Sequence, residues 1–229
     1  MHPADEPGPM VFVDDLAVPE LADDDRHHLT RVLRVRPGEA VLVGDGKGRW
    51  RTATLGTELE VTGPIVEEGP PAPVLTVGFA LVKGAKPELI VQKLTELGID
   101  RIVPFRADRS IVRWDDEKAA KAIGRLRAVA RAAAMQSHRP TLPTIDEVAD
   151  LSVLTALEGA ALTDRTGVAP TLDHPLLLVG PEGGWSPEER SLGAPVVALG
   201  DHVLRAETAA VTAGVLLTAL RAGIVASPS

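Results

Sequence analysis

A glycine-rich loop around position 180 is the segment of the chain best suited to hold a small molecule. An apolar stretch ending at Val179 runs into Gly180-Pro181-Glu182-Gly183-Gly184. Ser186, Pro187 and Glu189 follow, which supply an N-cap, a first helical residue and the second half of a capping box. Glycines let a backbone approach a ligand closely, and loops after parallel strands are usual ligand positions. The same pattern also fits a purely structural turn.

A second loop leads into the last helix of the chain. An apolar stretch ends at Leu199-Gly200, and Val203-Leu204-Arg205-Ala206-Glu207 follows. The residues after Glu207 are nearly all Ala, Val and Leu, so we expect a buried helix there. Charged groups at the entry of a buried helix must pair or contact a ligand. Arg205 and Glu207 therefore either form an ion pair that fixes the loop or bind a ligand.

Basic residues are concentrated locally in a chain of net charge −8. Residues 1–70 hold 7 Lys/Arg and 14 Asp/Glu, whereas residues 101–139 hold 10 Lys/Arg and 4 Asp/Glu. Phosphate binding requires such a basic segment, although a solvated helix face has the same composition. Arg109 and Arg139 stand near expected strand and helix ends, where an arginine can bind a phosphate or a carbonyl oxygen.

Two kinds of structure must position these segments. We expect strands at 10–13, 40–43, 50–55 and 59–62, a tight hairpin turn at Asp45-Gly46 and a short helix at 23–35. After a stiff linker at 69–73, strands at 74–82, 99–105, 160–163, 176–179 and 196–199 alternate with helices at 87–97, 116–137 and 207–221. This alternation predicts a parallel α/β sheet. We therefore expect a small β-rich domain over residues 1–69 and an α/β domain over residues 74–229, with residues 226–229 frayed.

Composition excludes several classes of function. The chain has no cysteine, which rules out disulfides, cysteine-ligated zinc and thiolate nucleophiles, and we assign no metal site. Gly44–Gly48 and Lys83–Lys86 lack the context of a phosphate-binding loop. The sequence has no apolar run of 18 residues and no signal peptide at its start. We therefore expect a cytoplasmic protein without a membrane span.

The order of the motifs resembles that of a known family. The resemblance rests on Gln92–Gly98, Gln136–Arg139, Gly180–Gly184 and Leu199–Ala209, and it covers nearly the whole chain. These segments resemble the RsmE-like 16S ribosomal RNA (uridine-N3) methyltransferases of the SPOUT class. The chain departs from the family at Met135, where Glu is usual, at His138, where Gly is usual, and at Asp201-His202, where Pro-Arg is common.

This resemblance implies a fold, a cofactor and partners. The fold would be a SPOUT-type parallel sheet with a deep C-terminal trefoil knot, plus a small N-terminal PUA-like β-barrel that binds RNA. The cofactor would be S-adenosylmethionine, the partner 16S ribosomal RNA or the small ribosomal subunit, and the protein a homodimer. Carried over, the cofactor-binding residues are Leu178, Gly180, Pro181, Glu182, Gly183, Gly184, Leu199, Gly200, Val203, Leu204, Arg205, Thr208 and Ala209. We take Arg26, Arg31, Arg34, Lys83, Lys86 and Lys93 as candidate RNA-binding residues.

Methyl transfer to a pyrimidine N3 is an in-line displacement, which requires alignment and exclusion of water. Loss of the N3 proton spreads negative charge over O2 and O4, and an arginine can stabilise that charge. Arg139, Arg109 and Arg205 are our candidates for this role, and Glu207 and Glu182 are candidates for the general base. Methylation at C5 generally requires a thiolate, which this chain lacks. The alternatives are a ribose 2′-O-methyltransferase of the same fold, a non-catalytic RNA-binding protein of ribosome assembly, and an acidic α/β protein with a small-molecule substrate.

Overall fold

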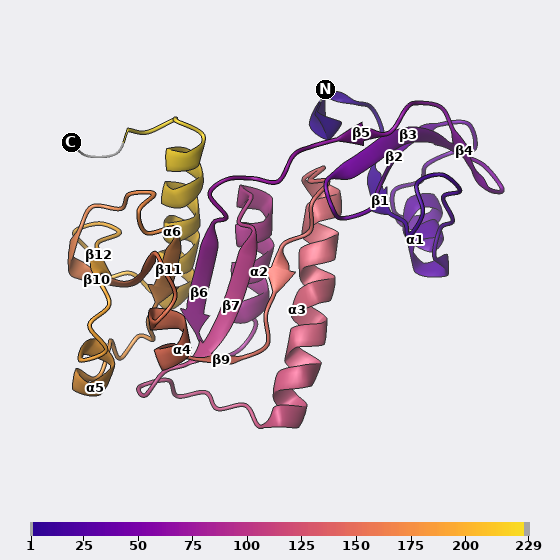
Figure 1. Ribbon diagram of the computed structural model, residues 1–229. Coiled ribbons are helices and arrows are strands. Elements are labelled where there is room, and N and C mark those ends of the chain that lie inside the picture. Colours follow the sequence, from indigo (N-terminus) through magenta and orange to yellow (C-terminus); the bar gives the residue numbers. More distant parts are fainter. Residues whose placement is uncertain (1, 227–229) are drawn as a thin grey trace. The chain divides into compact units, whose positions relative to one another are not determined.

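The computed structural model describes residues 2–226, so three of the four residues expected to fray lie outside it. The chain divides into two compact units (Figure 1). The first unit comprises Met1–Pro70 and Arg131–Leu142, and the second comprises Pro71–Ala130 and Pro143–Ser229. The expectation of two continuous segments, 1–69 and 74–229, misses the return of residues 131–142 to the first unit.

The first unit is built on a five-stranded sheet. Its strands are β1 (Met10–Phe12), β2 (Ala40–Gly44), β3 (Arg49–Leu55), β4 (Leu59–Val61) and β5 (Val66–Glu67), in the order β1-β2-β3-β4, with β5 also paired to β3. β1 and β2 are parallel, and the expected hairpin joins β2 to the antiparallel β3. A 3-10 turn (Pro3–Asp5), the short helix α1 (Asp23–His27) and a π-helical turn (His28–Val32) complete the elements before residue 70.

Residues 131–142 join this unit through side-chain contacts. Ala134 is fully buried in a cluster with Met10, Phe12 and Trp50. The Arg131 guanidinium forms an ion pair with Asp25 at 2.7 Å and lies 5.7 Å from the centre of the Phe12 ring. The departure of the segment from the expected boundary thus has a physical cause, because the end of the long helix supplies part of the first unit's core.

The second unit holds a seven-stranded parallel sheet. Its strands are β6 (Thr76–Ala80), β7 (Arg101–Arg106), β8 (Thr144–Ile145), β9 (Ala149–Asp150), β10 (Ala160–Val168), β11 (Leu176–Val179) and β12 (Val196–Val197). They lie in the order β12-β10-β11-β6-β7-β8, with β9 also paired to β7, and every pair is parallel. The helices are α2 (Lys86–Leu97), α3 (Asp116–Gln136), α4 (Leu151–Thr155), α5 (Pro187–Arg190) and α6 (Ala206–Arg221). The predicted parallel α/β sheet is therefore present.

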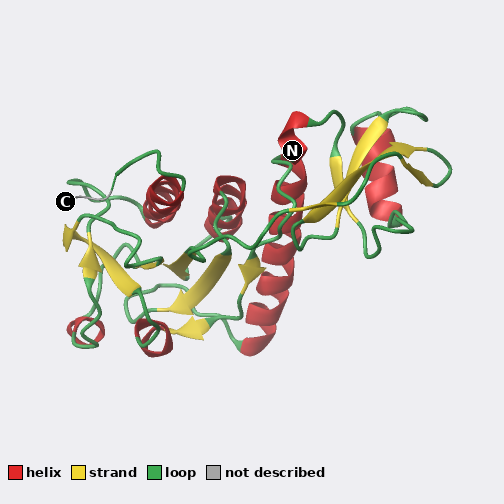
Figure 2. Cartoon of the chain, turned by 45° about the horizontal axis from the view of Figure 1, so that its top comes forward, coloured by secondary structure: helices red, strands yellow, loops and turns green. Residues whose placement is uncertain are grey.

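Different helices cover the two faces of this sheet (Figure 2). Val77, Phe79 and Ile102 point to one face, where they pack with apolar residues of α2, α3 and α6. Val103 and Phe105 point to the other face and pack with α4 and Trp185. Alternate residues of each strand therefore enter different cores, which explains the nearly continuous apolar runs in the sequence.

Several short elements escaped the sequence analysis. The strands β5, β8 and β9 have two residues each, and α4 has five. Segments this short contain too few residues to show a periodic pattern. β10 is longer than expected and extends to Val168, because its outer half pairs with β12 after a shift of register. No helix within residues 2–226 is long and apolar enough to cross a membrane.

Candidate functional site

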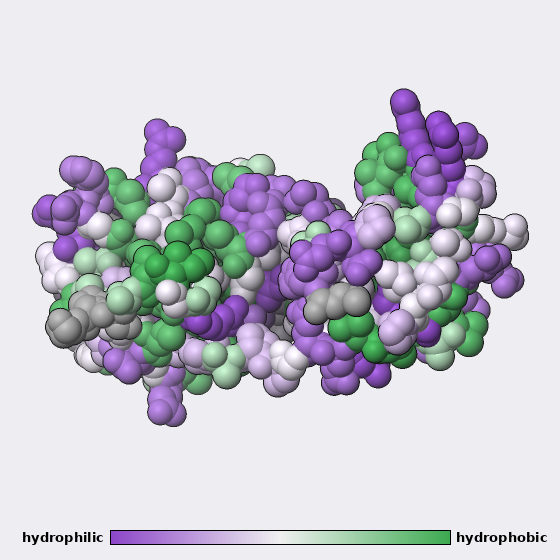
Figure 3. Space-filling view, turned by 90° about the horizontal axis from the view of Figure 1, so that it is seen from above, coloured by the Kyte–Doolittle hydropathy of each residue, from purple (hydrophilic) through white to green (hydrophobic). Residues whose placement is uncertain are grey.

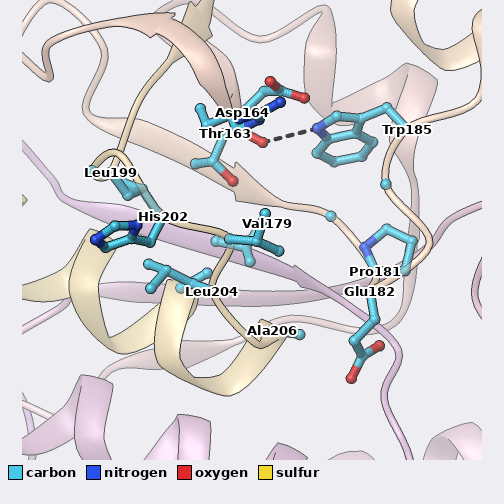
Figure 4. Close-up of a pocket in the computed structure, with 16 residues that line it drawn as sticks. Thr163, Asp164, Val179, Pro181, Glu182, Trp185, Leu199, His202, Leu204 and Ala206 are labelled. Atoms are coloured by element: carbon cyan, nitrogen blue, oxygen red, sulfur yellow. Dashed lines mark hydrogen bonds between the residues drawn. The ribbon is translucent and has the colours of Figure 1, made fainter.

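Two loops of the second unit and the middle of β10 meet around a cavity of about 250 Å³. The two loops follow β11 and β12, so they lie at the carboxyl ends of parallel strands, where α/β sheets place their ligands. Thr163, Asp164 and Arg165, in the middle of β10, form the remaining side. The lining residues are Thr163, Asp164, Arg165, Val179, Gly180, Pro181, Glu182, Gly184, Trp185, Leu199, Gly200, His202, Val203, Leu204, Ala206 and Ala209. We call this cavity the loop pocket. Figure 4 shows Leu199 and His202 on the side of the pocket opposite Pro181 and Trp185.

The Gly180–Trp185 loop is folded tightly on itself. A Cβ atom at Gly180 would lie only 2.9 Å from the Trp185 indole, so no larger residue fits without displacing that ring. Gly184 has a φ of 69°, in the left-handed region that favours glycine. The Trp185 indole is buried, donates from Nε1 to the Thr163 carbonyl at 3.0 Å, and stacks on Phe105. Trp185 therefore ties the loop after β11 to the middle of β10.

The capping box expected at Ser186 and Glu189 is present at the start of α5. The same two residues also bind the loop that follows β7. Ser186 Oγ donates to the Asp108 carboxylate at 2.6 Å, and the Asp108 backbone N–H donates to Glu189 at 2.9 Å. Beside them, Arg109 Nη1 donates to the Gly183 carbonyl at 3.0 Å. The loop after β7 thus supports the Gly180–Trp185 loop, which we call the glycine loop, from outside the pocket.

Lys86, at the start of α2, joins the glycine loop to the last helix. Its Nζ lies 2.9 Å from Glu182 Oε1 and 3.1 Å from Glu207 Oε2. The hydrogen bond with Lys86 holds the pKa of Glu182 below its ordinary value. Burial raises the pKa of Glu207, but hydrogen bonds from its own backbone N–H and from Lys86 outweigh burial, and the net shift is downward. The two carboxylates in turn raise the pKa of Lys86. Both carboxylates are therefore ionised at neutral pH.

These contacts decide one question that the sequence left open. Glu207 pairs with Lys86 and not with Arg205. Arg205 is exposed and forms the N-cap of α6 without a side-chain cap bond. Lys86, a candidate RNA-binding residue, is engaged by two carboxylates and is not a free cation.

The side of the loop pocket formed by β10 carries charge of both signs. Asp164 follows the first half of β10 and receives a hydrogen bond from Arg190 at 2.7 Å. Burial raises the pKa of Asp164, but hydrogen bonds from Arg190 and Thr166 outweigh burial, and the net shift is downward. The carboxyl therefore stays ionised. The next residue, Arg165, is exposed. Val179, Leu204, Ala206 and Ala209 contribute apolar surface.

The structure distributes the predicted cofactor residues between the pocket and its surroundings. Those that line the loop pocket are Gly180, Pro181, Glu182, Gly184, Leu199, Gly200, Val203, Leu204 and Ala209. Leu178 is fully buried in the core, and Gly183 packs against Arg109, where a Cβ atom would lie 3.1 Å from the arginine Cβ. Arg205 and Thr208 are exposed and do not line the pocket.

Sequence reasoning missed seven lining residues, namely Thr163, Asp164, Arg165, Val179, Trp185, His202 and Ala206. Thr163 ends the expected strand at 160–163, and Asp164 and Arg165 follow it. The rule that ligands bind beyond the carboxyl ends of parallel strands would have indicated them. Trp185 and Ala206 directly adjoin predicted residues.

The remaining candidates lie elsewhere. Arg139 belongs to the first unit, whereas Arg109 and Arg205 belong to the second. In the first unit, Arg26 donates to the Gly56 carbonyl at 3.0 Å, while Arg31 and Arg34 are exposed. In the second unit, Lys83 is exposed and Lys93 pairs with Glu96 at 2.7 Å. Within residues 2–226, no group of three or more His, Asp or Glu side chains could hold a metal ion.

Comparison with known proteins gives consistent matches along the chain. A family model described as an RNA methyltransferase domain matches residues 70–218, and one described as an RNA methyltransferase PUA domain matches residues 21–58. The ribosomal RNA small subunit methyltransferase E of Mycobacterium tuberculosis is 34% identical over 89% of this chain and 88% of that protein. The protein of the same name from Bacillus subtilis is 28% identical over 82% of this chain and 85% of its own length.

Comparison with solved structures also gives methyltransferases. The ribosomal RNA small subunit methyltransferase E of Neisseria gonorrhoeae, bound to S-adenosyl methionine, superposes with a TM-score of 0.78 at 30% identity, over 93% of this chain and 98% of that one. A methyltransferase of Legionella pneumophila in complex with the same cofactor superposes with a TM-score of 0.80 at 28% identity, again over 93% and 98% of the two chains.

Proposed function

Because the chain belongs to the RNA methyltransferase family, we propose that it transfers a methyl group from S-adenosylmethionine to N3 of a uridine in the 16S ribosomal RNA of the small subunit. The names of its relatives and the cofactor bound to the Neisseria and Legionella enzymes support this proposal. The observation that carries it is the loop pocket, formed by the loops that follow β11 and β12 and by the middle of β10.

The pocket suits an adenosyl cofactor chemically. Its glycines expose backbone N–H and C=O groups, which can hydrogen-bond adenine and ribose. Val179, Leu204 and Ala209 offer apolar surface for a purine ring. Glu182 and Asp164, both ionised, suit ribose hydroxyls or a cationic centre. We propose the nine predicted residues that line the pocket as cofactor contacts, together with the seven that sequence reasoning missed.

The cofactor supplies an electrophilic methyl group on a sulfonium; the chain must orient the uridine and stabilise the charge that N3 deprotonation creates. Arg109 and Arg205 belong to the same unit as the pocket and are exposed. Arg109 uses one N–H on the Gly183 carbonyl, and a guanidinium has five donors, so further donors remain for O2 or O4. We propose these two arginines, and Arg139 from the first unit, as the charge-stabilising candidates.

Glu207 does not suit the role of general base. A base works best with a pKa near the operating pH, whereas hydrogen bonds keep the Glu207 carboxyl ionised and weakly basic. We propose instead that Glu207 is a positioning residue, which holds Lys86 against the glycine loop. Glu182 binds the same lysine, and its pKa is also lowered, so we propose it as a cofactor contact rather than a base.

The finer architecture is part of the proposal. The second unit would contain a trefoil knot. This part of the proposal is supported by α6, which follows the edge strand β12 and packs back on β6 and α2. The first unit would be a PUA-like barrel, with Arg31 and Arg34 on RNA. A homodimer is supported by the hydrophobic side chains that gather near the end of α6 (Figure 3), where Ile224 is 77% exposed. An enzyme acting on ribosomal RNA would work in the cytoplasm.

The test is incubation of the purified protein with S-adenosylmethionine and either a 16S RNA transcript or purified small subunits, followed by mass spectrometry of the nucleosides. We expect N3-methyluridine, which also stops reverse transcription because N3 lies on the Watson–Crick edge. A 2′-O-methylated nucleoside would establish the alternative ribose methyltransferase. RNA binding without cofactor binding would establish the non-catalytic alternative.

A further inference from the structure

A second cavity, of about 550 Å³, lies in the second unit outside the loop pocket. Its lining comes from two loops and one helix. Val82, Lys83 and Gly84 follow β6, while Val112 and Trp114 precede α3. Lys118, Lys121, Ala122 and Arg125 belong to α3 and are spaced to lie on one helical face. We call this cavity the basic pocket.

The charge of the basic pocket contrasts with that of the chain. Four of its nine lining residues are cations and none is an anion, whereas the whole chain carries −8. Arg125 is paired with Glu88 at 2.7 Å, and Lys118 approaches Asp115 at 3.5 Å. No carboxylate within residues 2–226 forms an ion pair with Lys83 or Lys121. Two exposed lysines therefore remain available to an anionic ligand.

Trp114 gives the basic pocket an aromatic surface. Trp50 and Trp185, the other two tryptophans, are 0% and 3% exposed and serve the cores. Trp114 is only partly buried and lines the cavity. Lysines around an aromatic ring are the combination that single-stranded nucleic acid requires, because the ring stacks on a base while the cations bind phosphates.

Both loops of the basic pocket also lead to residues that contact the glycine loop, which lines the loop pocket. Lys83 stands three residues before Lys86, which binds Glu182 and Glu207. Trp114 stands five residues after Arg109, which binds the Gly183 carbonyl. Five residues of extended chain span at most about 18 Å. An RNA strand with one nucleotide at the loop pocket could therefore place neighbouring nucleotides at the basic pocket.

We infer that the basic pocket binds the unpaired RNA strand beside the nucleotide to be methylated. A base of that strand stacks on Trp114, and its phosphates contact Lys83, Lys118 and Lys121. This inference rests on the proposed function, and it adds the site that holds the substrate strand during methyl transfer.

The test uses Lys121→Gln, the double variant Lys118→Gln/Lys121→Gln, and Trp114→Leu. The matched control is Arg127→Gln, which removes one charge from α3 outside the pocket, where Arg127 pairs with Glu147. Binding of a 16S RNA transcript and of a twelve-nucleotide oligouridylate is measured over a range of salt concentrations. Each lost phosphate contact should reduce the slope of log K against log salt by about 0.7. Trp114→Leu should weaken binding at least fivefold.

The expected pattern is a raised KM for RNA in the three pocket variants, with unchanged affinity for S-adenosylmethionine and an unchanged melting temperature. Quenching of tryptophan fluorescence by oligouridylate should be present in the parent and absent in Trp114→Leu. RNA affinity and salt slope equal to those of Arg127→Gln would overturn the inference. If the parent does not methylate RNA, the proposed function fails, and the binding and quenching measurements still decide the inference. If Trp114→Leu does not fold, the surface lysine variants decide it.

Discussion

Lys86 Nζ lies 2.9 Å from the Glu182 carboxylate, 96 residues further along the chain. Through this contact the start of α2 holds the glycine loop, and the second carboxylate, Glu207, connects the same lysine to α6. A residue that charge alone suggests as an RNA contact is thereby part of the frame of the loop pocket.

Lys86→Met should therefore weaken cofactor binding more than RNA binding. Without the lysine, Glu182 and Glu207 repel each other, and the glycine loop loses one attachment. We expect affinity for S-adenosylmethionine, measured by calorimetry, to fall two- to tenfold, since the ion pair is partly exposed. Lys93→Met, which removes a lysine from the same helix, is the control. A loss of RNA affinity with intact cofactor affinity would return Lys86 to the RNA-binding residues.

The triad formed by Lys86, Glu182 and Glu207 also predicts how cofactor binding depends on pH. Glu182 and Glu207 have lowered pKa values, so they contribute fully to the free energy of unfolding above the ordinary carboxyl pKa of 4.5. That contribution disappears as pH falls through the lower pKa values of the folded protein. Lys86 has a raised pKa, so its contribution is complete below 10.5 and disappears only above that. Between these two ordinary values we expect no inflection from this triad. Glu207→Gln should leave the shape of the kcat profile unchanged, whereas a general base at this position would lose its inflection.

Gly180→Ala tests the packing of the glycine loop. The added Cβ would lie 2.9 Å from the buried Trp185 ring, so the indole must move and its bond to Thr163 must lengthen. Overpacking of this kind costs about 1–3 kcal/mol, or roughly 2–10 °C in melting temperature. Affinity for S-adenosylmethionine should fall at least tenfold. Gly69→Ala, where a Cβ meets nothing within 4 Å, is the matched control, and equal behaviour of the two variants would contradict the packing argument.

Arg131→Met tests the attachment of residues 131–142 to the first unit. The Asp25 side chain is only 9% exposed and would lose its cation. An unpaired buried charge costs about 3–5 kcal/mol, and we expect about 2–3 kcal/mol here because Arg131 itself is 36% exposed. The measurement is urea unfolding. The double variant Asp25→Leu/Arg131→Met should recover part of the loss, and an additive loss would show that the pair does not interact.

Much of the second unit could be predicted because its elements follow simple periodic rules. Pro87 and Gly98 mark the ends of α2, and the capping box at Ser186 and Glu189 specifies the short helix α5. The family resemblance, inferred from the paired loops, is confirmed by the family model over residues 70–218. The glycine loop could be located because its composition is unusual for a strand end.

Other features depend on contacts between distant residues. Nothing near Lys86 in the sequence indicates Glu182 or Glu207, which are 96 and 121 positions away. Thr163 and Asp164 enter the pocket only because β10 lies between β11 and β12. Ala134 joins the core of the first unit although it belongs to a helix that starts in the second. Local patterns carry no information about such pairings.

The wall formed by β12 and α6 has a consequence for synthesis of the protein. Leu199, Leu204 and Ala209 complete the loop pocket, but they emerge from the ribosome after β10 and β11. Their partner strands β10 and β11 can pair earlier, yet the cavity stays open on one side until β12 is added at the sheet edge. Contacts of such long sequence separation form slowly. A nascent chain therefore acquires its affinity for the cofactor only after β12 and α6 have been synthesised, so chains that lack these elements cannot sequester it.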